Sequence, residues 1–397
     1  MAWIGHVRQG RAIDEKGTPV SGAQVVVLDP KGRPQEHHPP TSVDGTFQIQ
    51  RFTNFPPGLQ VFLSHADFVR SIGPIPMDSS TVVSYEMRRK TKVWTAQFSG
   101  APDARVAFVE RDAKGLVAAF ERKTDAKGAA SIVTDPSCSY RNLPFAEVAG
   151  AFVRVTPQLT ATAPTPLENL ATELRYKEVT LLRKAALETT YRVGPETLLR
   201  FFFIPSSLND AIALAPILDA YDHTRETAFG GIHDHLCPLV RAGVLEGIGY
   251  CAYTVPGDSV EDVVRTRGPL SDEECLRLHQ EIAAVLPALE AKGLFHGNIA
   301  PRFVYRGPDG FRLAPPCPAL PLGVRFQRDH HVYDGRPGDD AYGLGATLYF
   351  AAAGKPPQYD VEEVAPPPNV GGMLEQRERL KPTGRSFDPL LRSLLEG

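Results

Sequence analysis

Short stretches in which apolar and polar residues alternate fill the first 91 residues of the chain. "AQVVVLDPKGRP", "LQVFLSHADF" and "STVVSYEMRR" each join a β-branched or aromatic run to turn residues, and Asp44-Gly45 precedes the alternating Phe47 and Ile49. A period of two is typical of strands with one buried face, and Asp-Gly favours a tight hairpin turn. We therefore expect an all-β sandwich of about seven strands over residues 1–91.

The same pattern returns more weakly over residues 92–157. "DARVAFVERDAKG" mirrors "GAQVVVLDPKG", and "KTDAKGAASIV" mirrors "TSVDGTFQI". This internal echo predicts a second small β-sandwich directly after the first. Two such units in tandem would make either a semi-rigid stalk or a pair of binding faces.

The pattern changes after the stretch "TPQLTATAPTPLENL", which is rich in Thr, Ala and Pro and has no period. We interpret residues 158–172 as a linker that few contacts cross, so that the β-rich part should fold without the rest. Further on, "SDEECLRLHQEIAAVLPALEAKG" carries apolar residues at 3–4 spacing, a capping box formed by Ser271 and Glu274, and Gly293 as a stop. This pattern predicts a long buried helix, and with it an α+β domain over residues 173–397.

Composition, charge and cysteine spacing argue against several kinds of partner and location. Apolar residues make up 42% and charged residues 22% of the 397 residues, and the formal net charge of −3 argues against a nucleic-acid partner. No apolar run reaches the roughly 20 residues that cross a bilayer, and the N-terminus has no secretory pattern. The five scattered cysteines are typical of reduced thiols, so we expect a cytoplasmic protein. The Ala, Arg, Gly and Pro bias hints at a bacterial source.

The segments "GTPVSGAQVVV", from Gly17 to Val27, and "TSVDGTFQI", from Thr41 to Ile49, resemble one known β-sandwich family. They are similar to the carboxypeptidase regulatory-like, transthyretin-like domains. That resemblance covers most of residues 5–70 and implies an accessory module without catalytic residues, used for adhesion or spacing.

From about Tyr176 onward the chain resembles the protein kinases. "HDHLCPLV", the block from "YCAYTVPGDSVEDVV" to "LFHGNIAP", and "GDDAYGLGATLYFAAAGKPP" follow that family's order and spacing over some 200 residues. The resemblance implies a kinase fold, made of a strand-rich lobe, a hinge and a helical lobe. It says little about activity, because a fold hosts many functions.

The same alignment implies a degenerate nucleotide site. Arg183, Ala185 and Glu188 stand where the family has the glycines that cradle phosphate, and side chains there would fill the phosphate space. Arg200 stands at the lysine position, with Glu226 as its expected partner on the helix that follows. An arginine keeps the charge of a lysine but not its compact geometry, so this pair is either a residual nucleotide clamp or a structural ion pair.

The catalytic loop has lost the groups that phosphoryl transfer uses. The family's base is replaced by Asn298, its second metal ligand by Phe303 and its main metal ligand by Pro315. Asparagine cannot take a proton, and the loss of a general base typically costs about 10²–10⁴-fold in rate. His296 and Asp340 align with two family residues that tie this loop to the helical core, which is a structural role.

Other chemistry-bearing residues have plainer explanations. His233, Asp234, His235, His330 and His331 could be metal ligands, but no third ligand is spaced for a site. Cys317 could be a nucleophile, yet no positioned base accompanies it. Pro315, Pro316, Pro318 and Pro321 either present a polyproline ligand or form a stiff segment that fills the substrate groove. We therefore expect no metal and no cofactor.

These observations favour a catalytically inactive pseudokinase on a β-sandwich stalk, acting as a scaffold or assembly subunit for other proteins. Two alternatives stay open: a pseudokinase that senses nucleotide without metal, and an enzyme that uses unconventional chemistry in the kinase cleft. The oligomeric state cannot be determined from the sequence.

Overall fold

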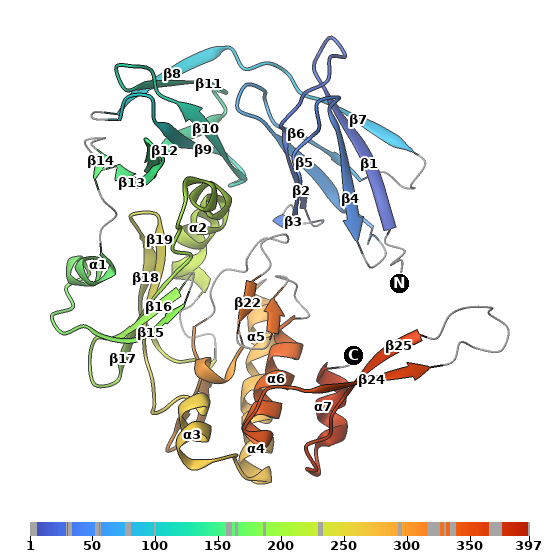
Figure 1. The fold of residues 1–397 in the computed structure, drawn as a ribbon, viewed down its shortest axis with the longest axis vertical. Coiled ribbons are helices and arrows are strands. Elements are labelled where there is room, and N and C mark those ends of the chain that lie inside the picture. The colour runs from blue at the N-terminus through green and yellow to red at the C-terminus, as the bar shows by residue number, and fades with distance from the viewer. Residues whose placement is uncertain are drawn as a thin grey trace.

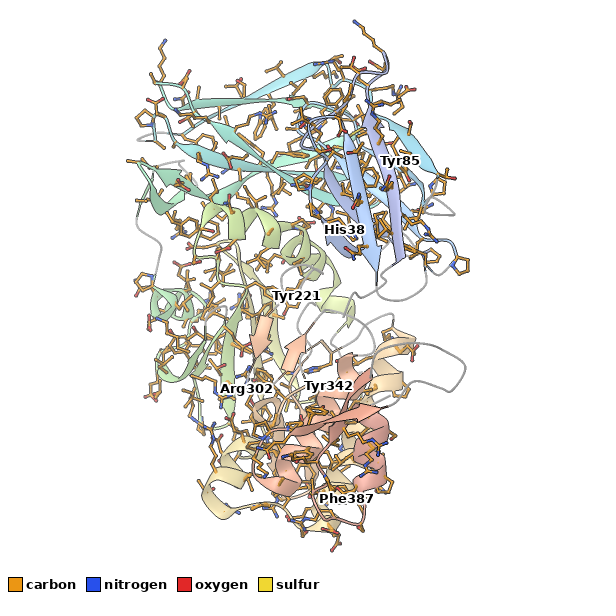
Figure 2. All side chains as sticks on the ribbon, turned by 45° about the vertical axis from the view of Figure 1, so that its right-hand side comes forward. His38, Tyr85, Tyr221, Arg302, Tyr342 and Phe387 are labelled. Carbon is orange, nitrogen blue, oxygen red and sulfur yellow. The ribbon has the colours of Figure 1, made fainter. Side chains whose placement is uncertain are left out.

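The structure is a computed structural model, and its strands and helices lie in three consecutive regions along the chain (Figure 1). It describes residues 6–28, 30, 34–51, 55, 57–75, 81–98, 101–155, 161–162, 166–185, 188–228, 233–292, 296–297, 299–315, 326–328, 331–333, 339–364 and 375–395. In Figure 2, Tyr85 marks the first β-rich unit, Tyr221 the helix that follows the second, and Phe387 the helical part.

The first β-rich unit consists of two sheets that face each other. One has the strand order β4-β1-β7 and the other β3-β2-β5-β6. Both sheets contribute to one buried core, for example through Phe47 and Ile49 from the first and Val25 and Val61 from the second. The strands are β1 (His6–Ile13), β2 (Gln24–Leu28), β3 (Pro34–His38), β4 (Thr46–Arg51), β5 (Gln60–Ser64), β6 (Ser71–Pro74) and β7 (Val82–Glu86). Its likeness to a particular β-sandwich family stays a prediction.

The second β-rich unit also pairs a larger sheet with a smaller one. Strand order is β10-β9-β12-β13-β14 in the larger sheet, and β11 pairs with β8 in the smaller. Phe98 of the chain after β8, Phe108 of β9 and Ile132 of β11 share one core. The strands are β8 (Lys92–Gln97), β9 (Arg105–Asp112), β10 (Val117–Lys123), β11 (Ala129–Thr134), β12 (Cys138–Val148), β13 (Ala151–Val155) and β14 (Ala161–Thr162).

A buried polar cluster joins the two β-rich units. Glu110 of β9 is 1% exposed, and it accepts hydrogen bonds from Arg70, Lys90 and Tyr140. Arg70 and Lys90 belong to the first unit, and Tyr140 lies on β12 of the second. A buried carboxylate is stable only when it is paired and hydrogen-bonded, so these contacts hold the units in one relative position.

The expected linker differs from what the structure shows. Within residues 158–172, β14 adds a strand to the second unit, and α1 (Leu167–Glu173) begins directly after Pro166. Leu170 and Ala171 of α1 are fully buried, in a cluster that also holds side chains from the second β-rich unit and from the sheet that follows. Contacts therefore do cross this segment, contrary to the expectation.

The third region opens with a five-stranded antiparallel sheet of order β15-β16-β17-β19-β18, covered by the long helix α2. Its elements are β15 (Thr180–Ala185), β16 (Glu188–Arg192), β17 (Thr197–Phe202), α2 (Leu208–Ala228), β18 (Leu239–Leu245) and β19 (Ile248–Thr254).

Helices and short hairpins make up the rest of the chain. They are α3 (Val260–Arg267), α4 (Asp272–Ala283), α5 (Val285–Ala291), the 3₁₀ turn η1 (Pro301–Phe303), β20 (Val304–Gly307), β21 (Gly310–Leu313), β22 (Phe326–Arg328), β23 (His331–Tyr333), α6 (Asp339–Ala353), β24 (Tyr359–Val364), β25 (Glu375–Leu380) and α7 (Asp388–Leu395). Residues of α3–α7 share one large buried core. No helix in the described part of the chain is long and apolar enough to cross a membrane.

The long helix expected after Ser271 is present as two consecutive helices. The capping box between Ser271 and Glu274 starts α4, as expected. Ala284 separates α4 from α5, because the ring of Pro287 has no N–H and would clash with the carbonyl four residues earlier, at Ala283. Leu278, Ile282, Val285 and Leu289 all face the core.

Candidate functional site

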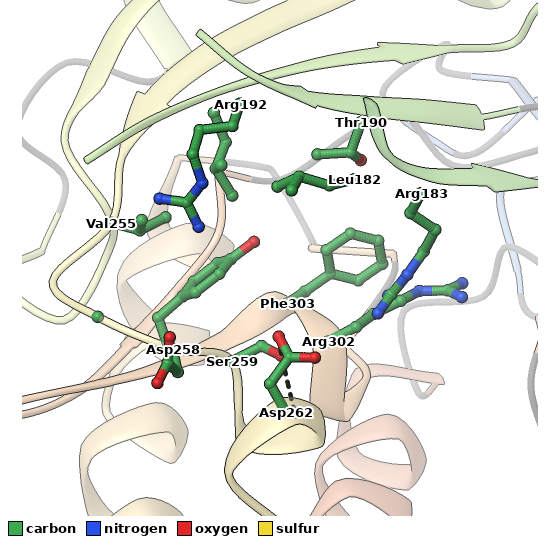
Figure 3. A pocket seen from close by; sticks show the side chains of 13 residues that line it. Leu182, Arg183, Thr190, Arg192, Val255, Asp258, Ser259, Asp262, Arg302 and Phe303 are labelled. Carbon is green, nitrogen blue, oxygen red and sulfur yellow. Dashed lines mark hydrogen bonds between the residues drawn. The ribbon is translucent and has the colours of Figure 1, made fainter. Parts of the chain in front are cut away.

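The candidate site is the space between the five-stranded sheet and the helical part, where the sequence resemblance to kinases predicts a nucleotide site. It holds a cavity of about 160 Å³, shown in Figure 3. Ligand pockets are usually about 300–1,000 Å³, so this cavity is small for a nucleotide. Its lining comes from β15–β17 above and from the chain before α3 and around η1 below: Leu182, Arg183, Thr190, Arg192, Leu198, Val255, Gly257, Asp258, Ser259, Asp262, Arg302, Phe303 and Tyr305.

Arg200, at the lysine position, is fully buried in an ion pair. Its Nη2 donates to Oε2 of Glu188 at 2.7 Å, and Glu188 is 3% exposed. Strand pairing explains the contact, because Thr190 lies opposite Arg200 and Glu188 is two residues further along the same face of β16. The guanidinium of Arg200 therefore already has a carboxylate partner.

Phe303 supports this ion pair from below. The guanidinium of Arg200 lies 4.1 Å from the centre of the Phe303 ring, within the range of a cation–π contact. In Figure 3 the ring rises from the floor of the cavity toward Leu182. Phe303 belongs to a buried cluster with Leu198 of the sheet and Tyr305 of β20, so apolar packing continues across the space. The side chain that the sequence alignment matches to a metal-binding amide of kinases is thus an apolar packing group.

Two tyrosines of this cluster contact each other beside the cavity, and one of them, Tyr305, lines it. The hydroxyls of Tyr253 on β19 and Tyr305 on β20 lie 3.0 Å apart and are buried. Burial raises the pKa of both phenols, and that of Tyr253 is well above its usual range. Both side chains therefore stay neutral and act as packing groups with one shared hydrogen bond.

The resemblance to kinases predicts the phosphate-binding loop at the hairpin β15–β16. At the end of this strand pair Ala185 lies opposite Glu188. Arg183 extends from β15 to Glu261 in the first turn of α3, and the ion pair measures 2.7 Å. Because β15 is above the space and α3 below it, this pair bridges the mouth. The side chain of Ala185 lies outside the described residues.

At the other end of the site, Asp340 of α6 holds the main chain at His296 and Gly297. The main-chain N–H groups of His296 and Gly297 donate to the two carboxylate oxygens of Asp340, at 2.6 and 2.8 Å. The Nε2 of His296 lies 2.9 Å from the carbonyl oxygen of Ala314, which can only accept, so this nitrogen carries the proton. Burial lowers the pKa of His296 to about 3, and the ring is neutral at physiological pH.

Several of the predicted positions cannot be placed. Asn298, Cys317, Pro316, Pro318, Pro321 and His330 lie outside the described residues, as do the side chains of Glu226 and His331. Pro315 is buried next to Ala314. His233 accepts a hydrogen bond on Nδ1 from the main-chain N–H of His235, and the ring of His235 donates to the carbonyl of Phe311. Among the described residues, no three His, Cys, Asp or Glu side chains are grouped to hold a metal ion.

Sequence reasoning missed two partners in this site. Glu188 is expected only as a side chain that fills the phosphate space, whereas in the structure it pairs with Arg200. The register of a hairpin over residues 188–202 would have revealed this contact. Glu261, which holds Arg183 and also Arg265, had no signal beyond its position in the first turn of a helix.

The comparisons with known proteins bear on the fold alone. Similar solved structures include a kinase domain of Mycobacterium tuberculosis PknI, which is 20% identical, with 54% of this chain and 85% of that chain covered and a TM-score of 0.38. A second structure of that kinase domain is 19% identical, with 55% and 88% covered and a TM-score of 0.37. No family model and no curated protein matches the chain. Both of these likenesses extend over about half of this chain, and a likeness of fold indicates nothing about activity.

Proposed function

We propose that this chain is a catalytically inactive binding protein, in which a pseudokinase carried on β-rich units acts as a scaffold or assembly subunit for other proteins. The observation that supports this most is the buried cluster of Arg200, Glu188 and Phe303. Three side chains that face one another fill the place where phosphate and metal would meet.

The energy of the ion pair makes nucleotide binding unfavourable. For a phosphate to use Arg200, the contact with Glu188 would have to open. Removing one partner of a buried pair costs about 3–5 kcal/mol. That loss corresponds to between about a hundredfold and a few thousandfold in affinity. Glu188 would in addition repel the triphosphate.

The chemistry of transfer is disfavoured for a separate reason. Phosphoryl transfer depends on metal ions that bridge the phosphates and on a residue that orients the nucleophile. At the family's metal-binding positions this chain has Phe303 and Pro315, neither of which offers a side-chain oxygen. Asn298 at the base position cannot accept a proton.

The test is incubation of the full chain with γ-labelled ATP and either Mg²⁺ or Mn²⁺, with and without a generic protein substrate. We expect no label in the chain or in the substrate above a heat-inactivated control. The matched control is Arg200→Ala in the same assay. Label that appears in the natural chain and disappears in this variant would refute the proposal.

The scaffold role needs its own experiment. Chemical crosslinking in the native cell, followed by mass spectrometry, should recover the same partner proteins from the natural chain and from Arg183→Ala, whose change lies in the cleft. Loss of all partners on changing this residue alone would place the binding function in the cleft instead.

A further inference from the structure

The helix α2 contributes to two buried clusters. Both hold side chains of the five-stranded sheet, and one of them also holds side chains of the second β-rich unit. On one face, Leu208, Ala211 and Ala215 share a core with Val109 of β9 and Phe145 of β12. On the other, Leu214, Leu218 and Tyr221 share a core with side chains of the five-stranded sheet and with Phe303. Figure 1 shows α2 between the sheet of β9, β10 and β12 and the sheet of β16–β19.

A carboxylate near the middle of α2 receives two arginines from the second β-rich unit. Asp219, 11% exposed, forms ion pairs with Arg111 of β9 at 2.7 Å and with Arg141 of β12 at 3.3 Å. Ten residues nearer the start of α2, Asn209 accepts a hydrogen bond from Arg105 of β9 at 3.1 Å. Polar contacts at both positions fix the rotation of the helix as well as its distance from the strands.

The hairpin β18–β19 provides a second anchor to the same unit. Glu246 at its tip forms an ion pair with Arg154 of β13. Gly247, with a φ of +77°, lies so close to Phe145 that a Cβ there would stand 2.6 Å from the ring. Such an approach needs glycine, because both the backbone conformation and the space exclude a side chain. The second β-rich unit therefore contacts both α2 and the sheet that α2 covers.

From these contacts we infer that the second β-rich unit is an intramolecular clamp that holds α2 in place and, through α2, keeps the cleft closed. The ring of Tyr221 packs against that of Phe202 with 5.1 Å between their centres, and the guanidinium of Arg200 lies over the rings of both Phe202 and Phe303. Opening the cleft floor away from the sheet would therefore disturb the packing of the inner face of α2. Because the outer face of the same helix is held by Arg111 and Arg141, opening also costs the clamp contacts. The clamp and the closed cleft are then coupled, and each stabilises the other by the same free energy.

Hydrogen exchange on the full chain tests the coupling. We expect Asp219→Asn to speed exchange of the α2 amides by about three- to tenfold and to speed exchange in η1 and β20 as well, since local openings are cooperative within a packed unit. Arg141→Ala, a change at a half-exposed side chain, should give the same pattern with smaller amplitude. The matched control is Lys123→Ala, which removes an exposed ion pair with Asp103 in the same β-rich unit and should leave α2 unchanged. Faster exchange confined to β9 and β12, with α2 and η1 unchanged, would overturn the inference.

A second measurement keeps the test valid if Asp219→Asn does not fold. Both tryptophans, Trp3 and Trp94, precede residue 100, and in the described part of the chain every α-helix follows residue 166. Tryptophan fluorescence therefore reports the β-rich part, and circular dichroism at the helical band reports the other half. The clamp predicts that both signals of the natural chain change together in urea, as in a single cooperative transition. Two separated transitions would overturn it.

Discussion

The two ends of the cleft differ in what their buried polar groups hold in place. At the loop end, Asp340 accepts two main-chain hydrogen bonds and His296 is buried and neutral, so the contacts hold the backbone of the loop. At the opposite end, called the phosphate end after the alignment made from the sequence, Arg200 pairs with Glu188 and lies over the ring of Phe303. The comparison teaches that buried polar groups fix the main chain at one end of the cleft, whereas at the other end they fix only one another's side chains.

The largest effect is expected from Asp340→Ala at the loop end. The change removes a charged acceptor from the N–H groups of His296 and Gly297. Hydrogen bonds to charged groups contribute about 1.5–3 kcal/mol each, so the free energy of unfolding should fall by roughly 3–6 kcal/mol. Urea unfolding at neutral pH measures it. A fall below about 1 kcal/mol would mean that this end is not a structural anchor.

At the phosphate end, Glu188→Ala should cost about 3–5 kcal/mol, because it leaves a charged guanidinium in the core without this carboxylate. The double variant Glu188→Leu/Arg200→Met should be more stable than Glu188→Ala, since apolar groups of similar volume often replace a buried pair at little cost. Urea unfolding of the single and double variants measures these stabilities. If the double variant loses as much free energy of unfolding as the two single changes added together, the pair is not a packing element.

The loop end should make the stability of the folded chain depend on pH. The pKa of His296 is about 3 in the folded chain and ordinarily about 6.5 in an unfolded one. The unfolded chain therefore binds a proton first as the pH falls, and this histidine lowers the stability by about 1.4 kcal/mol per pH unit between 6.5 and 3. At pH 5 the loss is about 2 kcal/mol. His296→Gln should flatten this part of the curve, and an unchanged slope would show that another group titrates.

The smallest effect is expected at the mouth of the cleft. Arg183 and Glu261 are 30% and 11% exposed, and partly exposed ion pairs contribute about 0.2–1 kcal/mol. Arg183→Ala should therefore lower the free energy of unfolding by less than about 1 kcal/mol. It should also leave the response to ATP unchanged, because the deeper pair remains. A rise of several degrees in melting temperature with ATP in this variant alone would identify Arg183 as the main barrier.

Much of the local structure could be predicted because its causes are local. The capping box of Ser271 and Glu274 depends on four consecutive residues, and the alternating strands of the first 91 residues depend on period two. The anchor of His296 to Asp340 could be anticipated only from family spacing, since 44 residues separate the two.

Contacts that depend on strand register or on packing between units were not predictable in the same way. The pairing of Glu188 with Arg200 requires the register of β16 against β17. The burial of Leu170 in the expected linker requires knowing what lies beside it. One signal was present in α2, whose sequence places apolar residues on two faces. A helix that is apolar on both sides is usually buried on both.

Titration calorimetry of the full chain with ATP, at millimolar concentration and with Mg²⁺, tests the central claim most directly. The ion pair of Arg200 with Glu188 and the ring of Phe303 fill the phosphate end, so the account predicts no saturable heat. A ligand present at 100 times its Kd stabilises the fold by about 2.7 kcal/mol. Because we expect no such binding, the melting temperature with ATP should stay within error of the value without ATP. Saturable binding at one ATP per chain, lost on Arg200→Ala, would contradict the account.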